Sequence, residues 1–188
     1  WVSSRWFAPN EFKKRGINGS FNGLYTPHWT FDAMTFCQWS GERGTYYYVK
    51  DQNGDEERRT RWDPVSGSFQ RFFDDTLVCA ARDAKRALME KLEPWPLEKL
   101  LPFNQEALAG HMAMTYEGDL PESFAIGKGR MEDALRSDIY SRIGGDDQRI
   151  NRMDTRYDAL TFKNVLLPLW MLAYRYSDKS YQVVVNAC

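Results

Sequence analysis

The chain has 188 residues, a size that favours one domain or two small ones and can bury a core without disulfides or metals. Its formal net charge is −1, from 25 basic and 26 acidic residues, so no global field attracts it to nucleic acid or anionic lipid, and either interaction needs a local patch. Aromatic side chains make up 15% of the residues and supply either large buried areas or surface anchors.

The three cysteines, Cys37, Cys79 and Cys188, lie far apart and form no CxxC pair. Their odd number and spacing argue against a disulfide framework and against a zinc site within this chain, and free cysteines fit a reducing compartment. We expect Cys37 and Cys79 to be small buried hydrophobes. We also expect no signal peptide and no transmembrane segment here, because the apolar runs are too short.

The first half of the chain reads as a short helix within residues 1–15, a loop to Gly23 and then an antiparallel meander. We predict strands over 24–39, 45–49, 56–62 and 68–73. Turns are predicted at 41–44, 51–54 and 64–67, where Gly, Pro and Asn cluster; the Asn-Gly pair at 53–54 is the strongest hairpin signal.

The second half opens with helical signals. Asp74 and Asp75 are predicted to cap a helix running to about Leu92, which residues 94–96 break, with a short turn of helix at 97–101. A strand is predicted over 108–117. A long helix is predicted from Pro121 to the glycine pair at 144–145, with apolar residues at helical spacing. Strands follow over 149–188, with a hairpin turn at 177–179.

These elements predict one α+β domain over 1–188, with antiparallel β blocks (a meander plus a C-terminal hairpin) and two main helices packed on them. The chain opens on Trp1 and closes inside a strand-like run that ends at Cys188. We therefore expect it to be a fragment of a longer protein.

Catalytic motifs are missing from this sequence. It contains no P-loop, no nucleophile elbow and no HExxH, so no motif indicates a helicase, an ATPase or a hydrolase, and we assign no catalytic residue. An enzyme that uses His28 or His111 with nearby carboxylates is the remaining catalytic alternative. The two histidines, His28 and His111, are weak candidates for metal ligands together with Asp32 or Glu117; a locally hydrogen-bonded histidine is the commoner alternative.

Two charged segments allow two interpretations each. Asp146-Asp147 follows the glycine pair and forms either a cation-binding turn or a solvated loop. In residues 154–158, alternation along a strand would place Asp154, Arg156 and Asp158 on one face as a charge ladder.

A basic run next to aromatic residues is the best sequence signal for nucleic-acid binding. It comprises Arg58, Arg59, Arg61 and Trp62, with Arg71 further along. Basic residues interleaved with aromatics can neutralise phosphates and stack bases. The acidic residues 55–57 adjoin the run, however, so a solvent-facing strand with ion pairs is the alternative.

Several segments, in the same order along nearly the whole chain, resemble a group of bacterial proteins that begin with a TFIIB-type zinc ribbon. These proteins are often described as primosomal protein N′-like, replication protein or superfamily II helicase. The segments are WFAPN (6–10), YTPHWTFDA (25–33), GERG (41–44), YYY (46–48), RFFDD (71–75), EPW (93–95), GGD (144–146), DTRY (154–157) and LPLW (167–170).

The resemblance implies a zinc ribbon upstream of this chain and no cofactor within it. It supplies no catalytic residues, and the helicase description finds no motif here. We expect a non-catalytic interaction or scaffold domain with a protein partner, in the cytoplasm or at the inner face of the membrane. The alternative is a nucleic-acid-binding accessory domain linked to DNA replication, with DNA as the partner.

Overall fold

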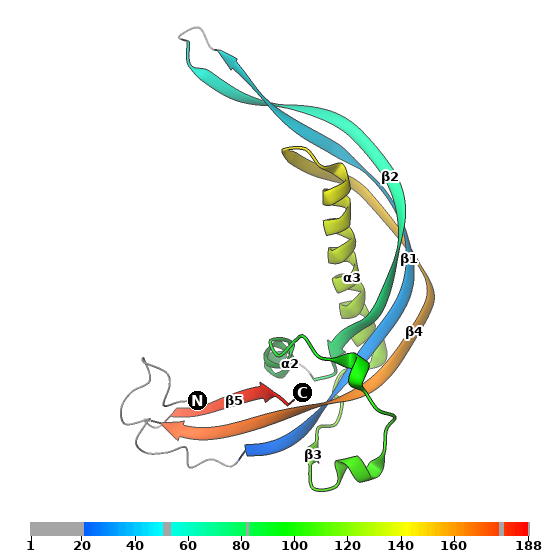
Figure 1. Cartoon of the computed structure of the whole chain (residues 1–188), viewed down its shortest axis with the longest axis vertical. Coiled ribbons are helices and arrows are strands. Elements are labelled where there is room, and N and C mark those ends of the chain that lie inside the picture. Colours follow the sequence, from blue (N-terminus) through cyan, green and yellow to red (C-terminus); the bar gives the residue numbers. More distant parts are fainter. Residues whose placement is uncertain (1–20, 51–53, 82, 177–178, 188) are drawn as a thin grey trace. The chain divides into compact units, whose positions relative to one another are not determined.

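The computed structural model describes residues 21–50, 54–81, 83–176 and 179–187, and these are mostly strand. The helix predicted within 1–15 and the turn residues 51–53 and 177–178 lie outside the described residues. In chain order the elements are β1 (Phe21–Lys50), β2 (Glu56–Cys79), α2 (Asp83–Glu90), the 3₁₀ turns η2 (Leu97–Lys99) and η3 (Gln105–Leu108), β3 (Met112–Ala113), α3 (Leu120–Ile143), β4 (Asp147–Tyr176) and β5 (Lys179–Asn186) (Figure 1).

The strands form one sheet in the order β2-β1-β4-β5, with the short β3 beside β1. Successive strands along β2-β1-β4 run in opposite directions (Figure 1). The pair β4/β5 is antiparallel, with Trp170 opposite Val185. Strand β3 runs parallel to β1, with Met112 beside Leu24. The predicted α+β class with antiparallel sheet is therefore confirmed, with one main helix, α3, and the short α2.

Two predicted turns are wrong, because β1 runs through 41–44 and β2 runs through 64–67. The glycines there serve close packing within a sheet. A Cβ on Gly41 would collide with the Arg149 carbonyl of β4, and a Cβ on Gly67 would lie 3.1 Å from the Trp39 ring. Glycine in a strand often marks such a close approach.

The helix predicted to start at Asp74 and Asp75 is also wrong at its start. Strand β2 continues to Cys79, and α2 has only eight residues from Asp83. The run Leu77–Ala81 is buried, so tertiary contacts outweigh the capping signal. The strand predicted over 108–117 reduces to Met112–Ala113.

The long helix α3 is confirmed, and so is its apolar face. Met131, Leu135 and Ile139 are fully buried at helical spacing, and Ile143 extends the row. They form one cluster with Phe31, Ala33, Cys37, Trp39, Phe73 and Val78 of β1 and β2. The helix ends where predicted, at Gly144 and Gly145, which have φ of 61° and 81°.

Packing divides the chain into two compact units. One comprises the described residues within 1–28, 79–119 and 165–188, and the other comprises 29–78 and 120–164. The second unit, called the helix-backed unit below, contains α3 and the cluster just described. The expectation of a single domain over 1–188 stays a prediction.

The buried state of Cys37 and Cys79 agrees with the expectation of small buried hydrophobes. No helix in the described part of the chain combines the length and hydropathy needed to cross a membrane.

Candidate functional site

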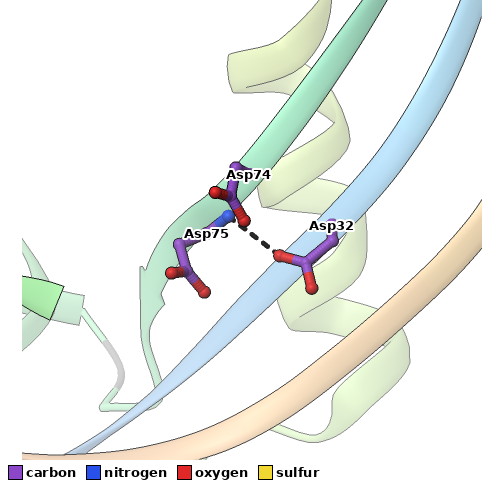
Figure 2. Close-up of side chains that lie close together, drawn as sticks. All are labelled: Asp32, Asp74 and Asp75. Carbon is purple, nitrogen blue, oxygen red and sulfur yellow. Dashed lines mark hydrogen bonds between the residues drawn. The ribbon is translucent and has the colours of Figure 1, made fainter. Parts of the chain in front are cut away.

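Three carboxylates gather on the helix-backed unit. Asp32 of β1 and Asp74 and Asp75 of β2 each offer an oxygen, and these oxygens all lie within 4.8 Å of one another (Figure 2). Such a group has the ligand type that hard divalent cations take. Asp74 is exposed, while Asp32 and Asp75 are half-buried.

A break in strand alternation brings Asp75 into this group. Phe73 is buried against α3, so alternation would also turn Asp75 towards the helix. Asp75 instead has a φ of 51°, in the left-handed region that Asp tolerates better than most residues. Its backbone N–H donates to Asp32 Oδ1 at 2.8 Å, the dashed line of Figure 2.

A second break of the same kind lies on β4, on the other side of β1. Tyr157 packs against the core, so alternation would place Thr161 on the helix side as well. Ala159 between them has a φ of 51°, and the Thr161 hydroxyl donates to Asp32 Oδ2 at 2.9 Å. Two left-handed residues on flanking strands thus direct polar groups onto one carboxylate.

Lys163 balances much of the charge of this group. Its ammonium lies 3.4 Å from Asp32 and 3.4 Å from Asp75. Burial alone would raise the pKa of Asp32, but the Asp75 N–H, the Thr161 hydroxyl and Lys163 together lower it. Asp75, then Asp32, raises the pKa of Lys163. A metal ion would have to displace this lysine, so the group acts as an ionic tie among β1, β2 and β4.

Local sequence patterns do not predict this group. They indicate Asp32 only as a possible metal-binding partner of a histidine, and they indicate Asp74 and Asp75 as a helix cap. The available signal was two adjacent Asp residues following the aromatic run of 72–73, because Asp is depleted in strands unless it has a special role.

The predicted nucleic-acid residues are divided between two places. Arg58, Arg59, Arg61 and Trp62 lie along β2 near the β1/β2 hairpin. Arg71 lies further along β2, where it pairs with Asp138 of α3 at 2.8 Å.

Near the hairpin, two of the arginines pair with acidic residues of their own strand. Arg59 contacts Glu57 at 2.8 Å, and Arg61 contacts Asp63 at 3.2 Å. The Arg58 guanidinium lies 4.5 Å from the centre of the Tyr46 ring. Cation–π contact of this kind keeps the charge while ordering the side chain.

Trp62 is covered by a further arginine. The guanidinium of Arg149 from β4 lies 3.7 Å from its ring centre and 3.9 Å from Glu42. The ion pairs reduce the positive charge that is available to bind phosphates. Nucleic-acid binding by these residues stays a prediction.

The two histidines lie in the other unit and have different surroundings. His28 is 2% exposed, and its Nδ1 lies 3.0 Å from the Thr26 carbonyl, so that nitrogen carries the proton. His111 is exposed and meets Tyr25 edge-on, with ring centres 5.7 Å apart. Among the residues that the structure describes, neither histidine belongs to a group of three potential metal ligands.

Asp146 contacts the backbone of β1. Its carboxylate accepts from the Tyr46 N–H at 2.8 Å, and its own N–H donates to the Gly44 carbonyl at 2.9 Å. Both the cation-binding and the solvated-loop interpretations of this turn stay predictions.

The second notable surface is the sheet face of the helix-backed unit opposite α3. Residues 31, 33, 37 and 39 are buried on the helix side, so Met34 and Phe36 point to the outer face. On β2, Phe73 is buried and Phe72 is 55% exposed. Within the described residues of this unit, no helix covers the outer face.

These apolar residues lie together. The Thr35 hydroxyl donates to the Arg71 carbonyl at 2.8 Å, and this contact indicates a register with Met34 opposite Phe72. We call Met34, Phe36, Phe72 and Arg156 the outer-face cluster, since the Arg156 guanidinium lies 5.7 Å from the Phe36 ring centre.

The charge ladder predicted on β4 borders the outer-face cluster. Arg156 pairs with Asp158 at 3.0 Å, and Arg152 pairs with Asp154 at 2.5 Å. The four side chains are exposed, as alternation predicts for one face. On the β4 side, the apolar residues of the cluster therefore adjoin a row of charged side chains.

The chain has a distant bacterial relative. It is similar to the uncharacterized protein YdjG of Bacillus subtilis (strain 168), with 26% identity over 199 residues. The similarity covers 99% of this chain and 54% of that protein, so the chain spans about half the length of the curated relative it matches. No family model and no solved structure matches the chain.

Proposed function

We propose that this chain is a non-catalytic protein-interaction module of a larger bacterial protein that carries a zinc ribbon, acting in the cytoplasm or at the inner face of the membrane. The outer-face cluster is the observation that carries the proposal. Aromatic residues, Met and Arg are enriched in the centres of protein interfaces, and polar residues form their rims. The cluster has this composition, and charged residues adjoin it on the β4 side.

The exposure of its members supports a role in binding. Phe72 is 55% exposed and Met34 is 37% exposed on a face whose opposite side forms the core. Truncating a central aromatic anchor commonly reduces affinity about 10-fold or more. The distant bacterial relative extends beyond the matched region, which agrees with a module in a longer chain.

The test compares capture of cellular proteins by the wild-type chain, a Phe72→Ser variant and a Phe103→Ser control. Phe103 is 72% exposed and lies in the other unit, so it matches the loss of an exposed phenylalanine. We expect a specific partner to be lost with Phe72→Ser and retained with Phe103→Ser. Equal capture by all three proteins would refute the role of the cluster.

A nucleic-acid accessory function is the second candidate. The observation favouring it is that Arg58 of β2 is exposed and lies over the ring of Tyr46 of β1. Tyr48, also on β1, is 64% exposed. Fluorescence anisotropy with single- and double-stranded DNA tests it. Binding that weakens with salt and falls in an Arg58→Ala variant would support this candidate, and absence of salt-dependent binding would reject it.

A further inference from the structure

Met34 is the feature from which we draw a further inference, because it combines exposure with a place in the outer-face cluster. Its side chain is 37% exposed, and that of Met112 in the other unit is 50% exposed. Five further methionines are buried or half-buried: Met89, Met114, Met131, Met153 and Met171. Among the described residues of the helix-backed unit, Met34 is therefore the exposed thioether.

The cysteine thiols of the described residues compete poorly for an oxidant. Cys37 and Cys79 are 0% and 1% exposed. Burial also raises the pKa of the Cys37 thiol, and the protonated thiol is the less reactive form. A hydroperoxide that approaches the native helix-backed unit therefore reaches the Met34 sulfur more readily than the Cys37 thiol.

Oxidation of Met34 would leave the core of this unit in place. Its side chain lies on the face opposite α3, because Phe31 and Ala33 of the same strand are buried on the helix side. The contact of Thr35 with the Arg71 carbonyl indicates that Phe72 lies opposite Met34. An added oxygen would therefore enter the outer face only, next to an exposed aromatic ring.

The chemical step adds one oxygen atom to the thioether. The O–O bond of a hydroperoxide breaks, an S=O bond forms, the sulfur loses two electrons, and hydrogen peroxide is reduced to water. The product is methionine sulfoxide, which a methionine sulfoxide reductase returns to the thioether. Sulfoxide formation turns an apolar side chain into a polar one and disrupts interfaces that contain Met.

The cluster has few hydrogen-bond donors for the new oxygen. Among its four side chains Arg156 alone carries N–H groups, and its guanidinium already pairs with Asp158 at 3.0 Å. Water would hydrate the sulfoxide in the unbound chain. A partner that covers the cluster removes this water, and a buried acceptor without a donor weakens binding.

We propose that Met34 is a redox modification site: a hydroperoxide converts it to the sulfoxide, which releases the protein partner from the outer-face cluster until a reductase restores the thioether. This inference rests on the proposed function. It adds a reversible control that the proposed function does not contain.

The first measurement needs no partner. The full chain is treated with hydrogen peroxide in its native state and in urea, and mass spectrometry of its peptides gives the oxidation rate of each methionine. We expect Met34 to oxidise about 10-fold faster than Met131 in the native chain and at a similar rate in urea. Equal rates in the native chain would overturn the inference and leave the proposed function standing.

The second measurement is capture of cellular proteins by the wild type, Met34→Leu and the control Met112→Leu, each before and after peroxide treatment and removal of the peroxide. Leucine keeps an apolar side chain of similar volume and forms no sulfoxide. Oxidation should reduce capture of the Phe72-dependent partner about 10-fold in the wild type and in Met112→Leu, but not in Met34→Leu. Treatment with the reductase should restore capture by the wild type.

A Met34→Gln variant tests the same effect without an oxidant. Its polar side chain should reduce capture of the partner, whereas Met112→Gln should not. Urea midpoints before and after oxidation check the fold, and a midpoint that falls in the wild type but not in Met34→Leu would overturn the inference.

Two results of the capture experiment would also overturn the inference: an oxidised wild type that retains the partner, or an oxidised Met34→Leu that loses it. If no captured protein depends on Phe72, the proposed function fails and the switch fails with it. The native oxidation rates are measured separately, so the two failures are distinguishable.

Discussion

Two glycines of α3 allow a matched test of how the helix packs on the sheet. A Cβ on Gly127 would lie 3.0 Å from Cδ2 of Phe31 and 3.5 Å from Cγ2 of Val78. Gly129 lies two residues further along the same helix, and a Cβ added there would meet nothing within 4 Å. The variants Gly127→Ala and Gly129→Ala therefore make the same chemical change in two different environments.

The expected magnitudes follow from these distances. Replacing glycine by alanine inside a helix contributes about 1 kcal/mol to the free energy of unfolding. At Gly129 that gain should appear almost unreduced. At Gly127 the new methyl group meets Phe31, which is 1% exposed and packs on Phe124 with ring centres 5.4 Å apart, so it has little room to move. Overpacking of this kind costs about 1 to 3 kcal/mol.

We therefore expect Gly127→Ala to be less stable than Gly129→Ala by about 1 to 3 kcal/mol. Urea unfolding followed by tryptophan fluorescence measures the difference, which corresponds to a midpoint separation of about 0.5 to 1.5 M for a typical urea dependence. If Gly127→Ala stabilises the chain as much as Gly129→Ala does, the close contact between α3 and β1 is refuted.

Two further predictions concern ionisable groups. The folded state lowers the pKa of Asp32, so its contribution to stability is present above the unfolded pKa of about 4 and is lost as pH falls through the folded value. Asp32→Asn should lower the free energy of unfolding by about 1 to 3 kcal/mol at pH 7 and should make stability fall less steeply below pH 4. Urea midpoints measured across this pH range would show both effects. If the variant loses stability below pH 4 as steeply as the wild type does, the ionic tie is contradicted. Burial raises the pKa of the Cys37 thiol, so Cys37 should resist alkylation in the native chain and react in urea. Site-resolved mass spectrometry would detect the difference. Rapid alkylation of Cys37 in the native chain would contradict its burial.

Sequence patterns were most reliable where local chemistry and packing agree. The apolar row of Met131, Leu135 and Ile139 predicted α3, and the glycine pair after Ile143 predicted its end. Those signals repeat every three or four residues and depend on no distant partner. Strand segments are predictable from local alternation and from their aromatic and β-branched residues, and together with the helix they indicate the α+β class.

Turn signals failed where glycine had another use. The glycines at 41, 44 and 67 look like turn residues in the sequence, but they lie inside strands where a neighbouring strand or ring approaches closely. Nothing local distinguishes the two uses, because both require the absence of a Cβ. Asp74 and Asp75 resemble a helix cap because Asp is a preferred N-cap residue, although both lie in β2.

The sequence by itself determined the class of fold, the main helix with its buried face, and the missing catalytic motifs. Only the tertiary structure decided which charged side chains meet. Asp32, Asp75 and Lys163 come from three strands, and two left-handed residues in β2 and β4 turn the side chains of those strands towards Asp32. Such contacts depend on strand order and register, which nonlocal packing sets and which no short segment of sequence encodes.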